Sequence, residues 1–174
     1  MKLFIYLSII TSLIFNTHLS TRNSLKVGDM TPNFTLIDEN GIEFTSSDYY
    51  NKQPLVIFFY PRDNSPVCTT EVCSFRDSFE DFKDLNAKIV GISRDNIMTH
   101  RDFSSKYKLP YSLLSDHSGR IHNLFGVSKG FLGLNPERVT FISNKKGRII
   151  YIFKKRSQAE KHTSEALLAL KKNE

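Results

Sequence analysis

The sequence predicts an α/β domain built on a central mixed β-sheet that helices cover on both faces. Two runs of consecutive apolar residues, PLVIFFY (54–60) and AKIVGIS (87–93), have the pattern of strands that are buried on both faces. A segment with helical periodicity follows each run, and this alternation is typical of parallel strands joined by helices. A hairpin late in the chain adds antiparallel strands, so the predicted sheet is mixed.

The first half of the domain begins with a predicted hairpin in NFTLIDENGIEFT (33–45), where two short alternating runs flank the turn sequence ENG. A helix is predicted from Pro66 to Leu85, because its apolar residues recur at intervals of three and four. These residues are Val72, Phe75, Phe79 and Phe82. A further helix is predicted over 96–109, and it must end before Pro110.

The second half continues with a short strand over 111–115 and a short helix within 118–127. The segment 138–155 reads as a second hairpin around the turn sequence NKKG. The last predicted element is an amphipathic helix over 159–172. Its inward-facing residues are Ala166, Leu167 and Leu170. A thioredoxin-like layout fits this order of elements, although periodicity alone does not separate it from other three-layer α/β folds.

The composition indicates one globular domain without disulfide staples. The chain has 174 residues, of which 40% are hydrophobic, and this is enough apolar material for a core. Two cysteines are too few for a disulfide scaffold. The net charge of +6 comes largely from the late runs NKKGR, FKKR and LKKN. Such runs are typical of solvated faces, so no nucleic-acid partner is expected, although they could favour an acidic protein surface.

The first twenty residues differ in character from the rest. Lys2 precedes a short apolar run, which is followed by the polar segment NTHLSTRNS. An apolar run of this length is short for a membrane span and typical of a signal peptide. We therefore expect residues 1–20 to be an export signal, with a retained N-terminal anchor or a buried core helix as alternatives. The folded domain is expected to occupy residues 25–174.

Both cysteines lie in one segment, YPRDNSPVCTTEVCSF (60–75), directly after a buried strand. Ser65 and Pro66 form the favoured pair of residues for the N-cap and first position of a helix. Cys68 then lies in the first turn, where free backbone N–H groups and the helix dipole favour a thiolate over a thiol. The carboxyl end of a buried strand is also where open α/β sheets bind ligands. The Ser65 hydroxyl is close enough in sequence to donate a hydrogen bond to the Cys68 sulfur or to an oxygen bonded to it.

The spacing of Cys68 and Cys73 is informative because it does not suit a static disulfide. Five residues along one helix separate the Cα atoms by about 8.6 Å. A disulfide requires these atoms to be within roughly 7 Å. The two cysteines could bond only if the first turns of the helix unwound, and a bond of this kind suits a disulfide that is made and broken in each turnover.

Other interpretations of the cysteines remain open at this point. They could be buried small apolar residues, or they could form a static disulfide in an exported binding or structural protein. General thiol–disulfide exchange on proteins would favour a C-x-x-C motif, which is absent. A zinc site would need two more ligands, and the histidines are scattered, so no metal is expected. They are His18, His100, His117, His122 and His162.

Several segments resemble the peroxiredoxin family, specifically its peroxiredoxin Q group, also called bacterioferritin comigratory proteins. The resemblance covers about residues 25 to 172. The segments that carry it are KVGDMTPNFTL, VIFFYPRDNSPVCTTEVCSFRDSF, IVGIS, KYKLPYSLLSD, ERVTFI and AEKHTSEAL. KYKLPYSLLSD and AEKHTSEAL are especially similar to plastid and cyanobacterial members.

The resemblance implies specific roles in the cysteine loop. The family signature P-x-x-x-T-x-x-C falls on Pro61, Ser65 and Cys68, with Ser in place of the common Thr. Val67 replaces the usual Gly before the cysteine, so the loop shape need not match that of the family. By resemblance, Cys68 is the peroxidatic cysteine and Cys73 the resolving cysteine.

Two arginines also match the family pattern. The active-site arginine of the family falls on Arg138, at the start of the RVTFI strand. Arg76 matches as well, but it could equally be a helix-surface residue that pairs with Asp77 or Glu80.

The resemblance implies a thiol-dependent peroxidase that reduces hydrogen peroxide and organic hydroperoxides to water and alcohols. Cys68 would become a sulfenic acid, form an intramolecular disulfide with Cys73, and be recycled by a thioredoxin-like dithiol. No cofactor is expected. The resemblance also implies a monomer, because members of the group are mostly monomeric. With an export signal, the expected locations are a periplasm or a thylakoid lumen. The chain would be anchored to a membrane if residues 1–20 were retained.

Overall fold

The computed structural model describes residues 24–127 and 136–173. The expected signal peptide or anchor over residues 1–20 lies outside these ranges. Within them, the chain forms a seven-stranded sheet with the strand order β2-β1-β5-β4-β3-β6-β7. The strands are β1 (Thr35–Asp38), β2 (Glu43–Thr45), β3 (Leu55–Phe59), β4 (Lys88–Ser93), β5 (Ser112–Ser115), β6 (Val139–Ser143) and β7 (Ile149–Lys154).

The pairing of the strands confirms the expected mixed sheet. Strands β3, β4 and β5 are parallel neighbours, whereas β1 with β2, β1 with β5, β3 with β6, and β6 with β7 are antiparallel. Both expected hairpins are present, as β1–β2 and as β6–β7. In the second hairpin, the Asn144 side chain accepts hydrogen bonds from the backbone N–H groups of Lys146 and Arg148. Gly147 has a φ of 77°, a left-handed conformation that glycine adopts without steric cost.

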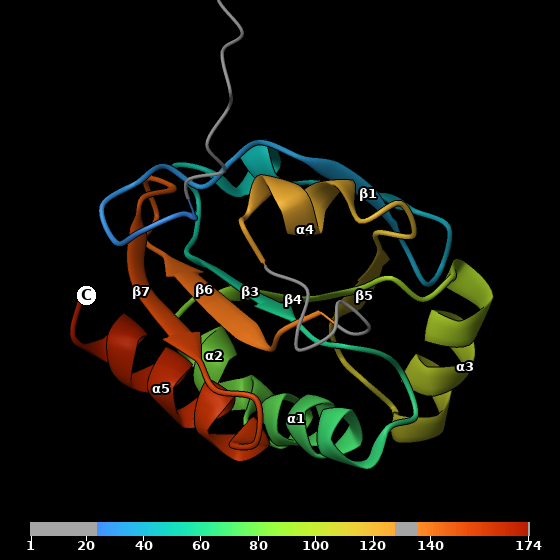
Figure 1. The fold of residues 1–174 in the computed structure, drawn as a ribbon. Helices are drawn as coiled ribbons and strands as arrows, with labels where there is room; N and C mark the ends of the chain where they lie inside the picture. The colour runs from blue at the N-terminus through green and yellow to red at the C-terminus, as the bar shows by residue number, and fades with distance from the viewer. Residues whose placement is uncertain (1–23, 128–135, 174) are drawn as a thin grey trace, which may run out of the picture.

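Helices cover both faces of the sheet (Figure 1). Helices α1, α2 and α5 lie together on one face, and α4 lies on the other with the 3₁₀ helix Ser46–Tyr49. The α-helices of the described residues are α1 (Pro66–Asp77), α2 (Phe79–Asp84), α3 (Ile97–Tyr107), α4 (Arg120–Leu124) and α5 (Ala159–Lys171). The chain between residues 24 and 127 and between 136 and 173 contains no helix long and apolar enough to cross a membrane.

The alternation of side chains along β3 divides the core into two clusters. Val56 and Phe58 contribute to the cluster beneath α1 and α5, whereas Ile57 and Phe59 contribute to the cluster beneath α4. Phe58 stacks on Phe75 of α1 with ring centroids 4.5 Å apart. This contact fixes the helix that carries both cysteines to the centre of the sheet.

The helix expected from Pro66 to Leu85 is in fact two helices. Ser78 has φ −101° and ψ 12°, so the chain leaves the helical conformation there, and α2 begins at Phe79. Apolar residues keep their spacing of three and four across this break, and Phe75 still contacts Phe82 with ring centroids 5.7 Å apart. Periodicity therefore did not reveal the interruption.

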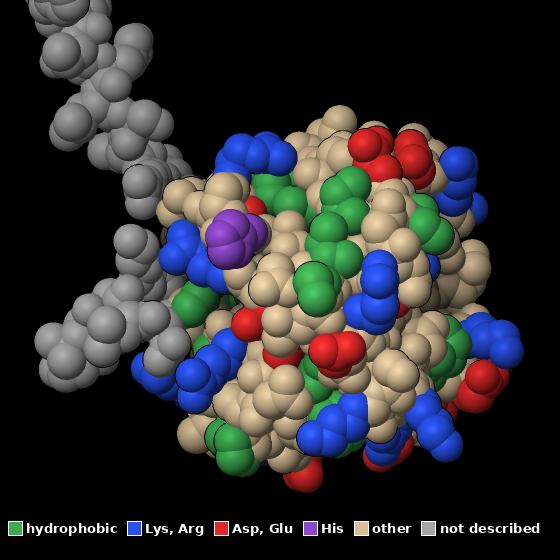
Figure 2. Space-filling view, turned by 90° about the vertical axis from the view of Figure 1, so that its right-hand side faces the viewer, with side chains coloured by type: hydrophobic (Ala, Val, Ile, Leu, Met, Phe, Trp, Pro, Cys, Tyr) green, Lys and Arg blue, Asp and Glu red, His purple; other side chains and the backbone are tan. Residues whose placement is uncertain are grey.

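The surface charges are dispersed rather than collected into one basic band on the face seen in Figure 2. Lys and Arg side chains on that face alternate with Asp and Glu side chains. Over the described surface as a whole, some charges pair directly, as Lys83 does with Glu80 at 2.9 Å. Such dispersal is typical of a solvated surface.

Candidate active site around Cys68

Cys68 lies where the sequence places it, in the first turn of α1 and just beyond the carboxyl end of β3. Ser65 is the N-cap residue and Pro66 the first residue of the helix, as expected. The Cys68 side chain is only 1% exposed, and its thiol is free. The first turn of a helix presents unpaired N–H groups and the positive end of the dipole, so this position favours negative charge on the sulfur.

Arg138 is the cationic partner of Cys68. Its Nη2 donates a hydrogen bond to the Cys68 Sγ at 3.2 Å. Strand β6 begins at Val139, which pairs with Phe59 at the end of β3, so Arg138 is delivered directly to the start of α1. The Arg138 Nε also donates to the carbonyl of Arg156 at 3.2 Å. Buried and held in this way, the guanidinium is fixed against the sulfur.

Glu71 is a site residue that the sequence did not reveal. It lies one helical turn after Cys68, on the same face of α1, and it is completely buried. Its Oε2 accepts a hydrogen bond from the Arg138 Nη1. A glutamate inside a helix is usually solvated, so its burial was not expected. The only sequence signal for burial was its position on the apolar stripe of the helix, three residues after Cys68 and four before Phe75.

A second layer lies behind Glu71. His162 of α5 is buried, and its Nδ1 lies 2.7 Å from the Thr140 Oγ1 and 3.5 Å from the Glu71 Oε1. Its Nε2 lies 2.9 Å from the carbonyl oxygen of Lys155. Two buried titratable groups therefore meet behind the arginine that contacts Cys68.

Burial shifts the pKa values of these two groups in opposite directions. It raises the pKa of Glu71 from its ordinary 4.5 to about 8, outweighing the opposing effect of Arg138. It lowers the pKa of His162 from 6.5 to about 4, and the charge of Arg138 adds to this effect. Near neutral pH, Glu71 is therefore protonated in the folded protein and His162 is neutral.

These shifts predict a pH dependence of stability. Between about pH 4.5 and 6.5 the two groups have opposite effects on the free energy of unfolding. Rising pH removes the Glu71 proton in the unfolded state only, which lowers stability. It also removes the His162 proton in the unfolded state, and this raises stability because His162 is neutral in the folded state. From pH 6.5 to 8 only Glu71 still contributes, since the folded state keeps a proton that the unfolded state has lost. Stability should therefore fall by about 2 kcal/mol over this range.

The prediction can be measured by urea denaturation of a Cys68→Ser, Cys73→Ser protein, in which thiols do not titrate. Glu71→Gln in the same background should abolish the fall in the free energy of unfolding between pH 6.5 and 8. If the free energy of unfolding fell equally with pH in the two proteins, the Glu71 carboxyl would be ionised in the folded state.

Cys73 lies on the same intact helix as Cys68 and is partly buried. With α1 unbroken between them, the estimate of about 8.6 Å for their Cα separation applies. Both thiols are free. The structure therefore represents the reduced protein with its helix wound.

The other residues expected at the site are placed around the first turn of α1. Pro61 and Ser65 are both partly buried in the loop that leads into the helix. The Ser65 hydroxyl donates to the carbonyl of Arg62 at 3.4 Å rather than to the Cys68 sulfur. Val67 is 43% exposed, so its side chain is accommodated in solvent without pressing on the loop. It lines a groove of about 380 Å³ together with Pro66, Thr70 and residues 157–161.

Arg76 has the role of a helix-surface ion pair, one of its two expected roles. Its Nη2 lies 2.7 Å from the Asp77 carboxylate, and its Nη1 donates to the carbonyl of Tyr107 at 3.0 Å. These contacts join the end of α1 to the end of α3, about two helical turns away from Cys68.

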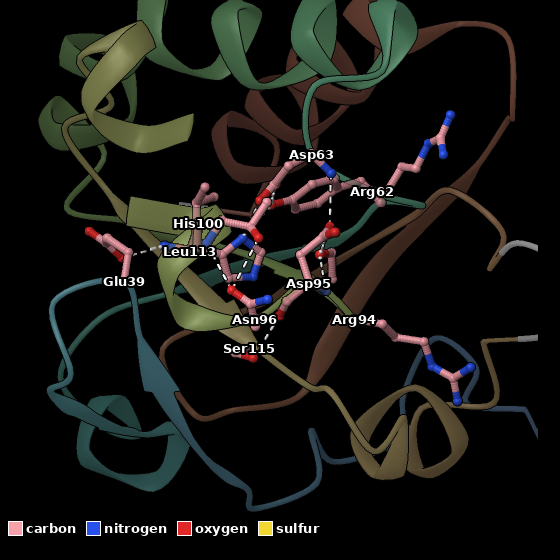
Figure 3. Close-up of polar contacts among 12 residues, drawn as sticks. Glu39, Arg62, Asp63, Arg94, Asp95, Asn96, His100, Leu113 and Ser115 are labelled. Carbon is pink, nitrogen blue, oxygen red and sulfur yellow. Dashed lines mark hydrogen bonds and ion pairs between the residues drawn. The ribbon is translucent and has the colours of Figure 1, made fainter. Parts of the chain in front are cut away.

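A buried network fixes the loop that precedes α1 (Figure 3). The Asp63 carboxylate accepts a hydrogen bond from the Tyr60 hydroxyl at 2.7 Å and lies 2.8 Å from the His100 Nδ1. The Asp63 N–H donates to the Asp95 carboxylate at 2.8 Å, and the Ser93 hydroxyl donates to the same oxygen at 2.6 Å. The loop is thereby tied to the ends of β3 and β4 and to α3.

Three described residues of this network have side-chain atoms that could act as metal ligands. The ligand atoms of Asp63, Asp95 and His100 lie within 4.8 Å of one another. Direct hydrogen bonds already connect these atoms to one another or to neighbours, including the Leu114 carbonyl at 3.3 Å from the His100 Nε2. The geometry is that of a closed hydrogen-bond network.

Removing His100 should weaken this network. His100→Ala leaves a buried carboxylate oxygen of Asp63 without its partner, at an expected cost of about 1–3 kcal/mol in the free energy of unfolding. Urea denaturation measures the loss, and the exposed His117→Ala is the matched control. Equal stability of the two variants would contradict an anchoring role for the Asp63–His100 pair.

The fold and the site together define a thioredoxin-like protein with a buried cysteine at a helix start, hydrogen-bonded to an arginine. Comparisons with known proteins agree. A model of the AhpC/TSA family matches residues 27–152. The chain is 41% identical over 143 residues to "Peroxiredoxin Q, chloroplastic" of Oryza sativa subsp. japonica, covering 82% of this chain and 65% of the relative. It therefore spans less than two thirds of the length of this relative.

Solved structures show the same relationship. The peroxidoxin BcpB of Mycobacterium tuberculosis superposes with a TM-score of 0.80 at 32% identity, covering 86% of this chain and 99% of that one. The bacterioferritin comigratory protein of Xanthomonas campestris, studied for its alkyl peroxide reduction activity, superposes with a TM-score of 0.73 at 31% identity, covering 80% and 91%. This chain belongs to the AhpC/TSA family, in its peroxiredoxin Q group. The expected thioredoxin-like fold is thereby confirmed.

Proposed function

We propose that this chain is a thiol-dependent peroxidase that reduces hydrogen peroxide and organic hydroperoxides, with Cys68 as the nucleophile. One observation carries the proposal: the Cys68 sulfur is buried at the start of α1 with the Arg138 guanidinium 3.2 Å away. The helix start and the guanidinium favour the thiolate, which is the reactive form of cysteine, against the opposing effect of burial. Membership of the peroxiredoxin Q group and the alkyl peroxide reduction activity of the Xanthomonas campestris relative support the same chemistry.

In the first step, the Cys68 thiolate attacks one oxygen of the peroxide. The O–O bond breaks, the sulfur becomes a sulfenic acid, and the other oxygen leaves as hydroxide or alkoxide and takes a proton to become water or an alcohol. The Arg138 guanidinium and the N–H groups of the first helical turn stabilise the charge that develops on the leaving oxygen. Pro61 shields the sulfur, and the Ser65 hydroxyl, which donates to the Arg62 carbonyl in this structure, rotates to donate to the bound peroxide.

In the second step, the first turns of α1 unwind and Cys73 condenses with the sulfenic acid. The S–O bond of Cys68 breaks, the Cys68–Cys73 disulfide forms, and water leaves. Unwinding is required because the intact helix holds the two cysteines too far apart for a bond. A thioredoxin-like dithiol then reduces the disulfide and is itself oxidised, which returns Cys68 to its resting state.

The location and assembly of the protein are part of the proposal. Residues 1–20 act as a signal peptide or an N-terminal anchor ahead of the domain 25–174. The rice relative is described as chloroplastic, and this supports a plastid compartment such as the thylakoid lumen over a periplasm. The domain acts as a monomer.

The test is an intact-mass measurement after one equivalent of hydrogen peroxide is added to the reduced protein. We expect the parent to lose two hydrogens, with the link mapped to Cys68 and Cys73 and reversed by thioredoxin. Cys73→Ser should instead gain oxygen on Cys68, because the sulfenic acid has no partner in the chain. An unchanged mass with the peroxide unconsumed would overturn the proposal.

A further inference from the structure

Glu71 Oε1 is a buried oxygen whose partner has to be identified. The other oxygen of this carboxyl accepts from Arg138, whereas Oε1 has no hydrogen bond among the described residues. The His162 Nδ1 lies 3.5 Å from Oε1. A small movement of either side chain would bring this pair within hydrogen-bond distance.

The hydrogen bonds of His162 determine what can occupy the space between these two atoms. Its Nε2 faces the Lys155 carbonyl at 2.9 Å, and a carbonyl only accepts, so Nε2 carries a hydrogen. In a neutral ring, Nδ1 is then an acceptor. An ionised Glu71 would place a second acceptor against it, which is unfavourable in a buried site. One proton between Oε1 and Nδ1 resolves the conflict, whichever of the two atoms holds it.

Thr140 is suited to either position of that proton. Its hydroxyl lies 2.7 Å from the His162 Nδ1 and accepts when Nδ1 is protonated; a bare Nδ1 has a single lone pair, so the hydroxyl turns away from it when the Glu71 O–H donates there. The side chain is completely buried, so water does not compete for this contact.

We propose that His162 is a positioning residue of the peroxidase site, which shares one proton with Glu71 and thereby keeps the Arg138 charge available to Cys68. This inference rests on the proposed function. With the proton in place, the Glu71–His162 pair has no net charge. It is either a neutral acid next to a neutral ring or a carboxylate next to an imidazolium. Arg138 then faces the Cys68 sulfur as an uncompensated cation. With the proton lost, the Glu71 carboxylate cancels the guanidinium charge, and the thiolate is less stable.

The groups facing the pair come from four elements. Arg138, just before β6, contacts Glu71 and also lowers the pKa of His162. Tyr111, just before β5, feels the Glu71 charge, although its hydroxyl donates to the backbone of Val72. From β7 the His162 ring meets the apolar ring of Phe153, with centroids 4.7 Å apart. Cys68 of α1 is connected to the pair through Arg138, whose Nη2 donates to its sulfur.

The experiment compares four proteins: the parent, His162→Asn, Glu71→Gln, and the double variant that carries both substitutions. A glutamine keeps a neutral group against Arg138 at every pH, which mimics the protonated acid. The readout is the pH at which the second-order rate constant for hydrogen peroxide reaches half its maximum. In the Glu71 protein, His162→Asn should raise this midpoint by about one unit or more, the lower end of the effect of a neighbouring charge. In the Glu71→Gln protein it should not move the midpoint. His117→Gln, on an exposed turn, is the matched control.

Two outcomes would overturn the proposal. An unchanged midpoint in His162→Asn would show that the ring does not influence Cys68. Equal shifts in the Glu71 and Glu71→Gln proteins would show a general structural effect. Failure of the proposed function is distinct, because the parent itself would then leave peroxide unconsumed.

A measurement on the parent decides the matter if His162→Asn does not fold. The infrared difference between the parent and Glu71→Gln at neutral pH reports the state of the Glu71 carboxyl, and nitrogen NMR reports the ring of His162. A protonated carboxylic acid beside a ring whose bare Nδ1 accepts a hydrogen bond, or an imidazolium with a carboxylate, supports the shared proton. A carboxylate beside a neutral ring excludes it.

Discussion

Cys68→Ser is expected to reduce peroxide consumption to the rate of the uncatalysed reaction. The hydroxyl of serine is nearly isosteric with the thiol, so the packing beneath α1 should persist. A serine hydroxyl, however, is far too weak an acid for Arg138 and the helix start to ionise it, and it cannot cycle through a sulfenic acid. Stopped-flow measurement of the peroxide remaining, with and without a thioredoxin system, provides the readout.

Cys73→Ser is the matched control for this loss, since it removes the other cysteine of the same helix. It should keep the first, stoichiometric burst of peroxide reduction and lose only recycling through thioredoxin. Equal bursts from Cys68→Ser and the parent would mean that Cys68 is not the nucleophile.

Arg138→Met should lower the second-order rate constant for hydrogen peroxide by roughly 10²–10³-fold, the usual effect of removing one donor aimed at a developing negative charge. Methionine retains much of the apolar bulk of the arginine stem but provides no charge and no donor. The measurement is the rate of a single turnover with excess reduced protein, which isolates peroxide attack from recycling.

Arg76→Met is the control for the arginine substitution, because Arg76 pairs with Asp77 and the Tyr107 backbone and does not touch Cys68. It should react with peroxide at nearly the parental rate. If the two arginine variants lost the same rate, the loss would reflect disturbance of α1 rather than the contact between Arg138 and the sulfur.

Much of the fold followed from local patterns in the sequence. Runs of consecutive apolar residues located β3 and β4, and turn sequences located both hairpins. Periodicity missed the break at Ser78, because apolar residues such as Phe79 continue the helical spacing across it. The order of strands in the sheet depends on long-range pairing, which periodicity does not report.

The site could be predicted only in part for the same reason. Helix-start chemistry located Cys68, and the resemblance to peroxiredoxins located Arg138. Glu71 and His162 were missed because each looks like an ordinary helix residue until α1 and α5 pack together over β6. The contact between Asp63 and His100 joins segments 37 residues apart, and no local pattern signals it.

The Asp63 network also sets the timescale on which the helix can cycle. The chain is fastened at Asp63 on one side, and Phe75 is buried in the core on the other. Opening the first turns of α1 is therefore a local unfolding event, which takes from microseconds to seconds rather than the roughly 0.1–1 μs of a free helical peptide. Until α1 opens, the sulfenic acid on Cys68 is exposed to a second peroxide, so this opening rate sets how readily the protein is overoxidised.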